Sequence, residues 1–258
     1  MKQKIAIAIL LLYSSFLGSC IGDRMDSGKT KSFVLAYQQM NNEDFQITQL
    51  DSVSIVMYST AVTMIGNWKS KGIDKKKYIS LSEKYGDVSY NRNIYVYHEN
   101  YINPIIDIYI KNIQVVSNND YDDHHPAGSN LSDIINYIGA SPYRFIQNNY
   151  VKRTSNPITE RGLLYVDKIM CGAVLCSIRD EELLQGYYVT EKCLSDLDID
   201  DLKMIGVRSS IVNKNYRCYS FGILEFTQIP TLEKIHTLKV TMNLVDGTKA
   251  EDTVVMKF

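Results

Sequence analysis

The amino-acid sequence predicts a mainly β protein, an antiparallel β-sandwich with a few short helices. The first observation is that apolar and polar residues alternate in many short segments, which places one set of side chains on a core face and the other outward. The second is a tight-turn pair, Asp246-Gly247, between two alternating segments at the C-terminus. The third is that helical spacing of apolar residues is found in few places.

Alternating segments predict strands along most of the chain. They lie at residues 53–57, 94–97, 106–110 and 113–117. The C-terminal pair is the clearest, because apolar residues alternate over 238–244 and again over 254–258, on either side of the Asp-Gly turn. This pattern is typical of a β-hairpin. The ending is similar to the last two strands of immunoglobulin-like sandwiches, so the expected fold is an immunoglobulin-like antiparallel β-sandwich.

Two short helices are also predicted. The apolar residues at positions 131, 134, 135 and 138 follow the i, i+3, i+4, i+7 spacing of an amphipathic helix. Asn130 is a suitable N-cap for this helix, and Gly139 is a suitable end. The lysine-rich stretch at 69–77 is interpreted as a solvated loop that leads into a second helix near 75–84.

The N-terminus has the features of an export signal. Lys2 and Lys4 precede an uncharged apolar stretch over residues 5–17, which is shorter than the roughly 20 residues that span a bilayer. We therefore predict a signal peptide at 1–19, removed in the mature protein. Leu17-Gly18-Ser19-Cys20 resembles the lipobox of bacterial lipoproteins, and the alternative is a secretory signal that ends in a cysteine by chance.

The lipobox resemblance implies that Cys20 is the site of lipid attachment and the first residue of the mature chain. Two or more acyl chains anchor a protein stably in a membrane. Ile21 follows the cysteine where an Asp often marks retention in the inner membrane, so the outer membrane is the expected location. Whether the protein faces the surface or the periplasm is left open.

The remaining chain is expected to form one domain. Residues 20–31 are interpreted as the lipidated cysteine and a flexible polar tether. Residues 32–258 are interpreted as a single elaborated β-sandwich domain, with a possible split near Pro104. The formal net charge of −1 gives no electrostatic reason to expect nucleic acid as a partner.

Four cysteines follow the lipidation site. They are Cys171, Cys176, Cys193 and Cys218. An even number in an exported protein is compatible with two disulfides, whose connectivity the sequence leaves open. The alternative is four buried thiols, because free cysteine is among the most buried residue types.

A polar segment after the strand at 113–117 carries the candidate metal ligands. These are Asp120, Asp122, Asp123 and His125, whose oxygen and nitrogen atoms suit Ca²⁺ and Zn²⁺ respectively. The alternative is a polar turn in which the Asp side chains bind the backbone. A second acidic run at 196–201 begins like an EF-hand but lacks its glycine and its final glutamate, so EF-hand binding is excluded.

The same polar segment carries a family resemblance. A strand ending at Ser117 is followed by Asp120, Asp122 and the run 125–129 (HPAGS), and then by Leu131 and Asp133. This order is similar to a segment in uncharacterised lipoproteins of gut Bacteroidota-type bacteria, over about residues 105–135. The resemblance implies a lipid-anchored location and a β fold, and it implies no activity.

Tyrosines are candidate binding residues, because aromatic rings stack on sugars and anchor protein partners. Tyr95 and Tyr97 share one face of a predicted strand, and the alternative is that they are strand formers on a half-exposed sheet. They belong to a tyrosine-rich stretch that consists of Tyr85, Tyr90, Tyr95, Tyr97, Tyr101 and Tyr109.

The sequence favours a binding protein over an enzyme. It contains no G-x-S-x-G, no H-E-x-x-H, no phosphate-binding loop and no dinucleotide-binding motif. The leading hypothesis is a non-enzymatic outer-membrane lipoprotein that binds a partner protein or a glycan at the cell envelope, without a cofactor. The alternative is a cell-surface hydrolase, or an accessory subunit of a glycan-processing system, that uses carboxylates such as Asp120 and Asp122.

Overall fold

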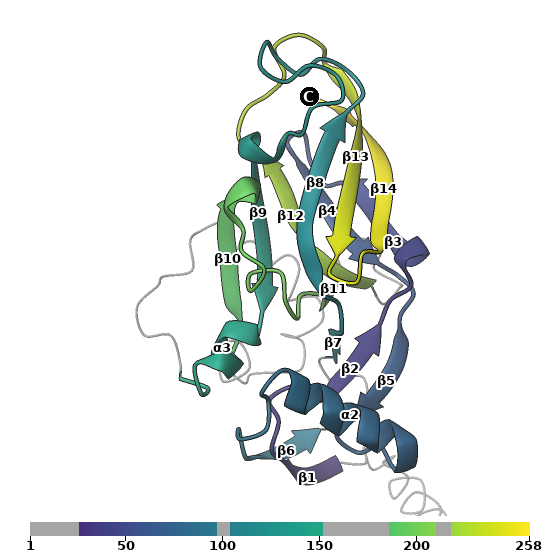
Figure 1. The fold of residues 1–258 in the computed structure, drawn as a ribbon, viewed down its shortest axis with the longest axis vertical. Coiled ribbons are helices and arrows are strands. Elements are labelled where there is room, and N and C mark those ends of the chain that lie inside the picture. Colours follow the sequence, from purple (N-terminus) through teal and green to yellow (C-terminus); the bar gives the residue numbers. More distant parts are fainter. Residues whose placement is uncertain (1–25, 97–103, 152–185, 210–217) are drawn as a thin grey trace, which may run out of the picture.

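The computed structural model describes residues 26–96, 104–151, 186–209 and 218–258 of the chain. Within them the protein is mainly β, as the sequence predicts. The two described α-helices are α2 (Gly72–Lys84) and α3 (Tyr143–Gln147). Single 3-10 turns form η1 (Asn42–Asp44), η3 (Ser132–Ile134) and η5 (Leu194–Asp196). Figure 1 shows the longer strands at one end of the molecule, and α2 with several short strands at the other.

The largest sheet has the strand order β10-β9-β12-β4-β3, and β11 pairs with the first part of β12. All of its pairings are antiparallel. The bounds of its strands are β3 Phe45–Gln49, β4 Ser54–Ser59, β9 Ile135–Ser141, β10 Tyr188–Cys193, β11 Val207–Ser209 and β12 Cys218–Phe226.

The second sheet contains the C-terminal hairpin. Its order is β14-β13-β8, with β8 at Ile110–Ser117, β13 at Ile235–Leu244 and β14 at Lys249–Lys257. β13 pairs antiparallel with β14 and with β8, which confirms the predicted hairpin. This sheet lies in front of the largest sheet in Figure 1. The two are joined at one edge, where the Ile47 backbone N–H donates to Asp252 Oδ2 over 2.9 Å.

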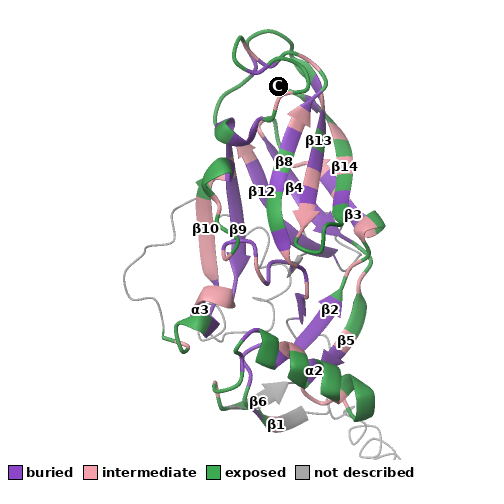
Figure 2. Cartoon of the chain, viewed as in Figure 1, coloured by how far each residue is buried: buried purple, intermediate pink, exposed green. Residues whose placement is uncertain are grey.

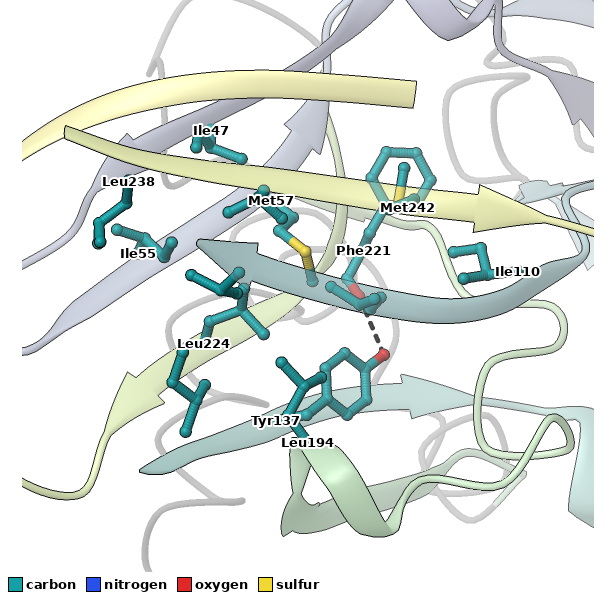
Figure 3. Close-up of a cluster of buried hydrophobic side chains, with 14 of the residues drawn as sticks. Ile47, Ile55, Met57, Ile110, Tyr137, Leu194, Phe221, Leu224, Leu238 and Met242 are labelled. Atoms are coloured by element: carbon teal, nitrogen blue, oxygen red, sulfur yellow. Dashed lines mark hydrogen bonds between the residues drawn. The ribbon is translucent and has the colours of Figure 1, made fainter. Parts of the chain in front are cut away.

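The main hydrophobic core fills the space between these two sheets (Figure 3). Leu238 and Met242 of β13 lie against Ile55 and Met57 of β4, and none of these side chains is exposed. The Tyr137 hydroxyl donates to the Phe221 carbonyl over 2.9 Å, so its polar end is satisfied inside the core. Two facing antiparallel sheets with a shared core give a sandwich-like arrangement.

A β-bulge in β12 keeps its apolar residues on this core. The register with β4 shifts between Ser220 and Gly222. Tyr219 precedes the shift, Phe221 lies within it, and Leu224 and Phe226 follow it; all four belong to the main core. A bulge adds one residue, so the alternation continues one position later. Gly222 has φ +131°, a backbone conformation that favours glycine.

The central strands are also buried on their second face. In β4, Ile55 and Met57 belong to the main core, whereas Val56 and Tyr58 belong to a second apolar cluster. Figure 2 shows β9 and β12 buried along most of their length. The second cluster joins the large sheet to α2, α3 and β2, through the buried residues Tyr78, Phe145 and Tyr37 among others.

The end of the molecule that carries α2 contains two small sheets. One has the order β5-β2-β7, with β5 at Thr63–Asn67, β2 at Ala36–Gln39 and β7 at Pro104–Ile106. The other pairs β1 (Asp26–Thr30) with β6 (Arg92–Val96). β7 lies parallel to β2, and Pro104, the possible split point, pairs with Ala36 at its start.

The helix predicted over 130–139 is wrong. Residues 132–134 form η3, and Ile135–Ser141 form β9, a central strand of the largest sheet. The helical spacing is misleading because β9 is buried on both faces, with Tyr137 in the main core and Ile138 in the second cluster. Asn130 caps no helix: its side-chain oxygen accepts from the Ser132 backbone N–H (3.2 Å) and hydroxyl (2.6 Å).

Three predicted boundaries also change. The helix expected near 75–84 is confirmed, but it starts at Gly72 and so includes much of the predicted lysine-rich loop. The strand expected over 106–110 ends at Ile106, and β8 begins at Ile110. Residues 26–30 of the predicted tether form β1, where Gly28 permits close packing because a Cβ atom there would lie 2.3 Å from the Trp68 ring.

The hairpin supplies a matched pair of valines to test the core. Val240 is fully buried between the sheets, whereas Val255 is 55% exposed on β14. We expect Val240→Ala to lower the free energy of unfolding by about 2.5 kcal/mol, because it removes two buried methyl groups and leaves a cavity. Val255→Ala should change it by less than about 0.5 kcal/mol. Urea denaturation of both variants measures the difference, and equal effects would contradict the assigned core.

Candidate functional site

The described residues bring tyrosine and lysine side chains together where α2, α3 and the start of β8 meet. We call this group the tyrosine–lysine cluster; its members are Lys84, Tyr85, Tyr109, Tyr143 and Lys203. Lys84 is the last residue of α2, and Tyr143 is the first residue of α3. Tyr109 precedes β8 and forms an isolated antiparallel β-bridge with Lys203. Four places that are distant in sequence, residues 84–85, 109, 143 and 203, are therefore neighbours in space.

A stack of three tyrosine rings leads from the core to this cluster. The ring centroids of Tyr37 and Tyr85 are 5.8 Å apart, and those of Tyr85 and Tyr109 are 5.6 Å apart, with 12° between the planes in both pairs. Tyr37 and Tyr85 are buried, whereas Tyr109 is half-buried. Stacking on buried rings fixes the orientation of the Tyr109 ring, so the cluster presents a rigid aromatic group at the surface.

Two lysines flank the Tyr109 ring. Lys84 Nζ lies 4.4 Å from its centroid, and Lys203 Nζ lies 5.8 Å from it, within the range of a cation–π contact. Lys203 Nζ also lies 4.6 Å from the centroid of the Tyr143 ring and 3.2 Å from its hydroxyl. Both aromatic rings are thus held by cations rather than by apolar packing alone.

Each lysine is paired with a carboxylate. Lys84 Nζ is 2.7 Å from Asp107 Oδ1, which also accepts from the Tyr85 hydroxyl over 2.6 Å. Lys203 Nζ is 2.7 Å from Asp200 Oδ1. Two ammonium groups and two carboxylates leave the site with no net charge. Such a site combines hydrogen-bond donors, acceptors and aromatic surface, and it has no electrostatic preference for an anion or a cation.

The protonation states agree with these contacts. Burial would lower the pKa of Lys203, but hydrogen bonds to Asp200 and Tyr143 outweigh it and raise the pKa. Burial raises the pKa of Tyr109, against an opposing effect of the Lys203 ammonium. Burial and the neighbouring Asp107 carboxylate raise the pKa of Tyr85 further. At neutral pH the lysine is therefore charged and the tyrosines are neutral hydrogen-bonding groups.

Three aspartates of the acidic run at 196–201 pair with basic side chains. Asp201 is buried and accepts from Arg144 Nη2 over 2.7 Å and from Lys192 Nζ over 2.6 Å. Asp198 Oδ2 lies 2.9 Å from Arg144 Nη2. Burial would lower the pKa of Arg144, but its bonds to the two carboxylates raise it. These ion pairs join α3 to β10 and hold the loop that positions Lys203.

The candidate metal ligands form a closed turn. Asp120 Oδ1 accepts from the Ala127 backbone N–H over 2.7 Å. Asp122 Oδ1 accepts from the backbone N–H groups of His124 (2.8 Å) and His125 (2.9 Å). The side chain of Asp123 is exposed. Within residues 104–151 and the other described ranges, no three His, Cys, Asp or Glu side chains are grouped to hold a metal ion. The geometry is that of a polar turn.

His125 is clamped between two carboxylates in this turn. Its Nδ1 lies 2.8 Å from Asp122 Oδ1, and its Nε2 lies 3.2 Å from Asp133 Oδ1. Burial opposes protonation of the ring, but the bonds to Asp122 and Asp133 outweigh it and raise the pKa of His125. Burial likewise opposes ionisation of Asp122, but the N–H groups of His124 and His125 outweigh it and lower the pKa of Asp122.

A serine–histidine pair lies close by but is structural. Ser117 Oγ is 2.7 Å from His236 Nδ1, a contact that nucleophilic catalysis could use. However, Ser117 is 2% exposed and His236 is fully buried, so no substrate reaches the hydroxyl. His236 Nε2 lies 3.0 Å from the Glu233 carbonyl, and the ring packs against Tyr121. The pair ties the end of β8 to the start of β13.

Several predicted site residues lie partly or wholly outside the described ranges. Cys20, Tyr97, Cys171 and Cys176 are outside them, and for Tyr95 only the backbone pairing with Ser27 is described. Cys193 carries a free thiol, with its Sγ 3.4 Å from the Ser132 carbonyl. Cys218 is buried in β12. Two disulfides would require Cys193 to be paired, so the structure does not support that arrangement, and the free thiol of Cys193 agrees with the alternative of unpaired cysteines. The Tyr95–Tyr97 face stays a prediction.

Sequence reasoning missed most of the tyrosine–lysine cluster. Tyr85 and Tyr109 belong to the tyrosine-rich stretch, but Tyr143 and Lys203 lie far from it along the chain. The one local signal was the density of tyrosines before β8. Contacts such as the β-bridge between Tyr109 and Lys203 follow from the tertiary fold alone.

No protein-family profile, curated protein or solved structure matches this chain. Among the described helices, none is both long and apolar enough to cross a membrane. The function is therefore inferred from the chemistry of the residues themselves.

The His125 clamp predicts a pH dependence of stability. Because the folded state raises the pKa of His125 above its ordinary 6.5, its contribution is complete below that pH and is lost as the pH rises through the folded-state value. Because the pKa of Asp122 is lowered from 3.8, its contribution is lost as the pH falls below that value. The stability difference between wild type and His125→Gln should therefore be largest at about pH 5.

Urea denaturation of both proteins across acidic to alkaline pH measures this difference. The matched control is His124→Gln, because His124 is exposed and its side chain makes no hydrogen bond among the described residues. This control should keep the wild-type profile. If the difference in unfolding free energy between wild type and His125→Gln stays constant from acidic to alkaline pH, the charge of His125 contributes nothing to stability.

Proposed function

We propose that this protein is a lipoprotein anchored in the outer membrane through Cys20, and that its β-sandwich body binds a glycan of the cell envelope without catalysing a reaction. We also propose that the β-sandwich is immunoglobulin-like. This assignment is supported by the two facing antiparallel sheets and by the C-terminal hairpin. The anchor is supported by the signal-like residues 1–19 and by Leu17-Gly18-Ser19-Cys20.

The observation that carries glycan binding is the charge-balanced tyrosine–lysine cluster. Sugars expose apolar C–H faces that stack on aromatic rings, and hydroxyl groups that bond to both donors and acceptors. The half-buried Tyr109 and Tyr143 rings supply the first kind of contact. Lys203 and Asp200 supply the second, at the edge of the same rings. A neutral polar ligand fits a site whose ion pairs already cancel.

The alternative of a surface hydrolase has less support. Asp120 and Asp122 each accept backbone N–H bonds within their own loop, and they belong to a polar turn. A general acid needs a carboxyl group with a raised pKa, whereas the pKa of Asp122 is lowered. The Ser117–His236 pair is buried. Binding without turnover is therefore the better-supported function.

The anchor is tested by changing one residue. In a bacterium with the lipoprotein pathway, the wild-type chain should incorporate labelled palmitate, begin at Cys20 and fractionate with the outer membrane. Cys20→Ser should lose the label and leave the membrane fraction. Mass spectrometry of the N-terminal peptide identifies the acyl groups. A processed wild-type chain that carries no acyl group would contradict the anchor.

Glycan binding is tested on the two half-buried rings. We expect the full chain to bind at least one envelope polysaccharide on a glycan array. Tyr143→Ala should raise the dissociation constant of that complex about tenfold, because the variant loses the ring that stacks on the sugar. Tyr143→Phe keeps the ring and should retain most of the affinity, which makes it the matched control. Tyr109→Ala should behave like Tyr143→Ala, provided that thermal unfolding shows both variants folded. Unchanged affinity in both alanine variants, or no glycan binding at all, would contradict the proposal.

A further inference from the structure

Helix α2 lies at the same end of the molecule as β1, the described strand that follows Cys20 in the sequence. β1 begins at Asp26, six residues after Cys20, and packs against the segment that leads into the helix. A Cβ atom on Gly28 would lie 2.3 Å from the Trp68 ring, and Ser32 Oγ lies 3.1 Å from Ser82 Oγ of α2. Figure 1 shows β1 and α2 together, at the opposite end from the C-terminus.

The helix has a buried face and an exposed face. Tyr78 and Ser82 are buried, and the Tyr78 hydroxyl donates to the Val34 carbonyl over 2.8 Å. The exposed stripe follows helical spacing and consists of Ile73, Lys76, Lys77 and Ser80. Ile73 is 66% exposed and Ile79 is 43% exposed, although both are large apolar residues. Figure 2 shows the outward side of α2 as exposed.

The first half of α2 and the residues just before it carry a concentrated positive charge. Residues 69–77 contain five lysines and one aspartate, a net charge of +4 in a protein whose overall charge is −1. Lys71, Lys76 and Lys77 are exposed, and none of them forms an ion pair with another described residue. They differ in this respect from Lys84 at the end of the same helix, which is paired with Asp107. A basic stripe with exposed isoleucines suits an anionic, partly apolar surface.

We infer that the exposed face of α2 lies on the anionic phospholipid surface of the leaflet that holds the acyl chains of Cys20. This inference rests on the proposed anchor, because a chain of six residues spans at most about 20 Å and so keeps β1 close to the membrane. Lys71, Lys76 and Lys77 contact phosphate groups, while Ile73 and Ile79 enter the boundary between headgroups and acyl chains. The helix fixes the orientation of the body, with the sandwich pointing away from the membrane.

The test compares vesicles of phosphatidylcholine alone with vesicles that also contain phosphatidylglycerol. The processed full chain should show slower amide hydrogen exchange over 72–84 only on the phosphatidylglycerol vesicles. In Lys76→Glu/Lys77→Glu, the ratio of the two partition coefficients should fall by at least about 30-fold, since each lost cation contributes about fivefold and the added carboxylates are repelled by the anionic surface. The matched control is Lys111→Glu/Lys257→Glu, which makes the same charge change on the far sheet and should keep the wild-type ratio.

The outcomes separate this inference from the proposed anchor. An acylated chain that binds both vesicles equally, with unchanged exchange over α2, would overturn the inference and leave the anchor intact. A chain without acyl groups that still prefers phosphatidylglycerol through Lys76 and Lys77 would support the contact of α2 with anionic lipid and contradict the anchor. An equal loss in the two charge-reversal variants would also overturn it, because net charge alone would then explain the binding.

Discussion

The rest of the structure depends on one constraint, which is that the central strands of the large sheet are apolar on both faces. Ile55 and Val56 of β4 point to opposite sides, and neither is exposed. A strand of this kind needs a layer on each side, because apolar surface left in water costs about 25 cal/mol per Å². The hairpin sheet covers one face, and residues around α2, α3 and β2 pack on the other. The residues around α2 are therefore needed to cover the second face of the large sheet.

This constraint also decides which elements the sequence could predict. The hairpin of β13 and β14 is buried on one face, so its residues alternate and its Asp-Gly turn is readable. β9 has no polar face, and its apolar positions imitate a helix. In β12 the bulge near Gly222 breaks the alternation at one residue. The pattern of a single sequence identifies strands that are buried on one face. It misleads where a strand is buried on both faces, because such a strand has no alternating polar residues.

The candidate sites show the same limit at the level of side chains. Asp120, Asp122 and His125 are close in sequence and have the composition of a metal site, yet one oxygen of each Asp side chain accepts hydrogen bonds from backbone N–H groups. The tyrosine–lysine cluster has no local motif, since Tyr109 and Lys203 meet only through the fold. Composition shows which chemistry is available, whereas the tertiary structure determines which groups meet.

The pairing of β8 with β13 has a consequence for how the chain reaches its native state. β8 ends at Ser117, and its partner Leu238 lies more than a hundred residues later. Contacts of such long sequence separation form slowly, because a large loop must close before they are made. The sheet of β8, β13 and β14 cannot assemble until residues 235–257 are available for pairing. Until then the apolar face of the large sheet has no cover, and apolar surface exposed in this way favours aggregation.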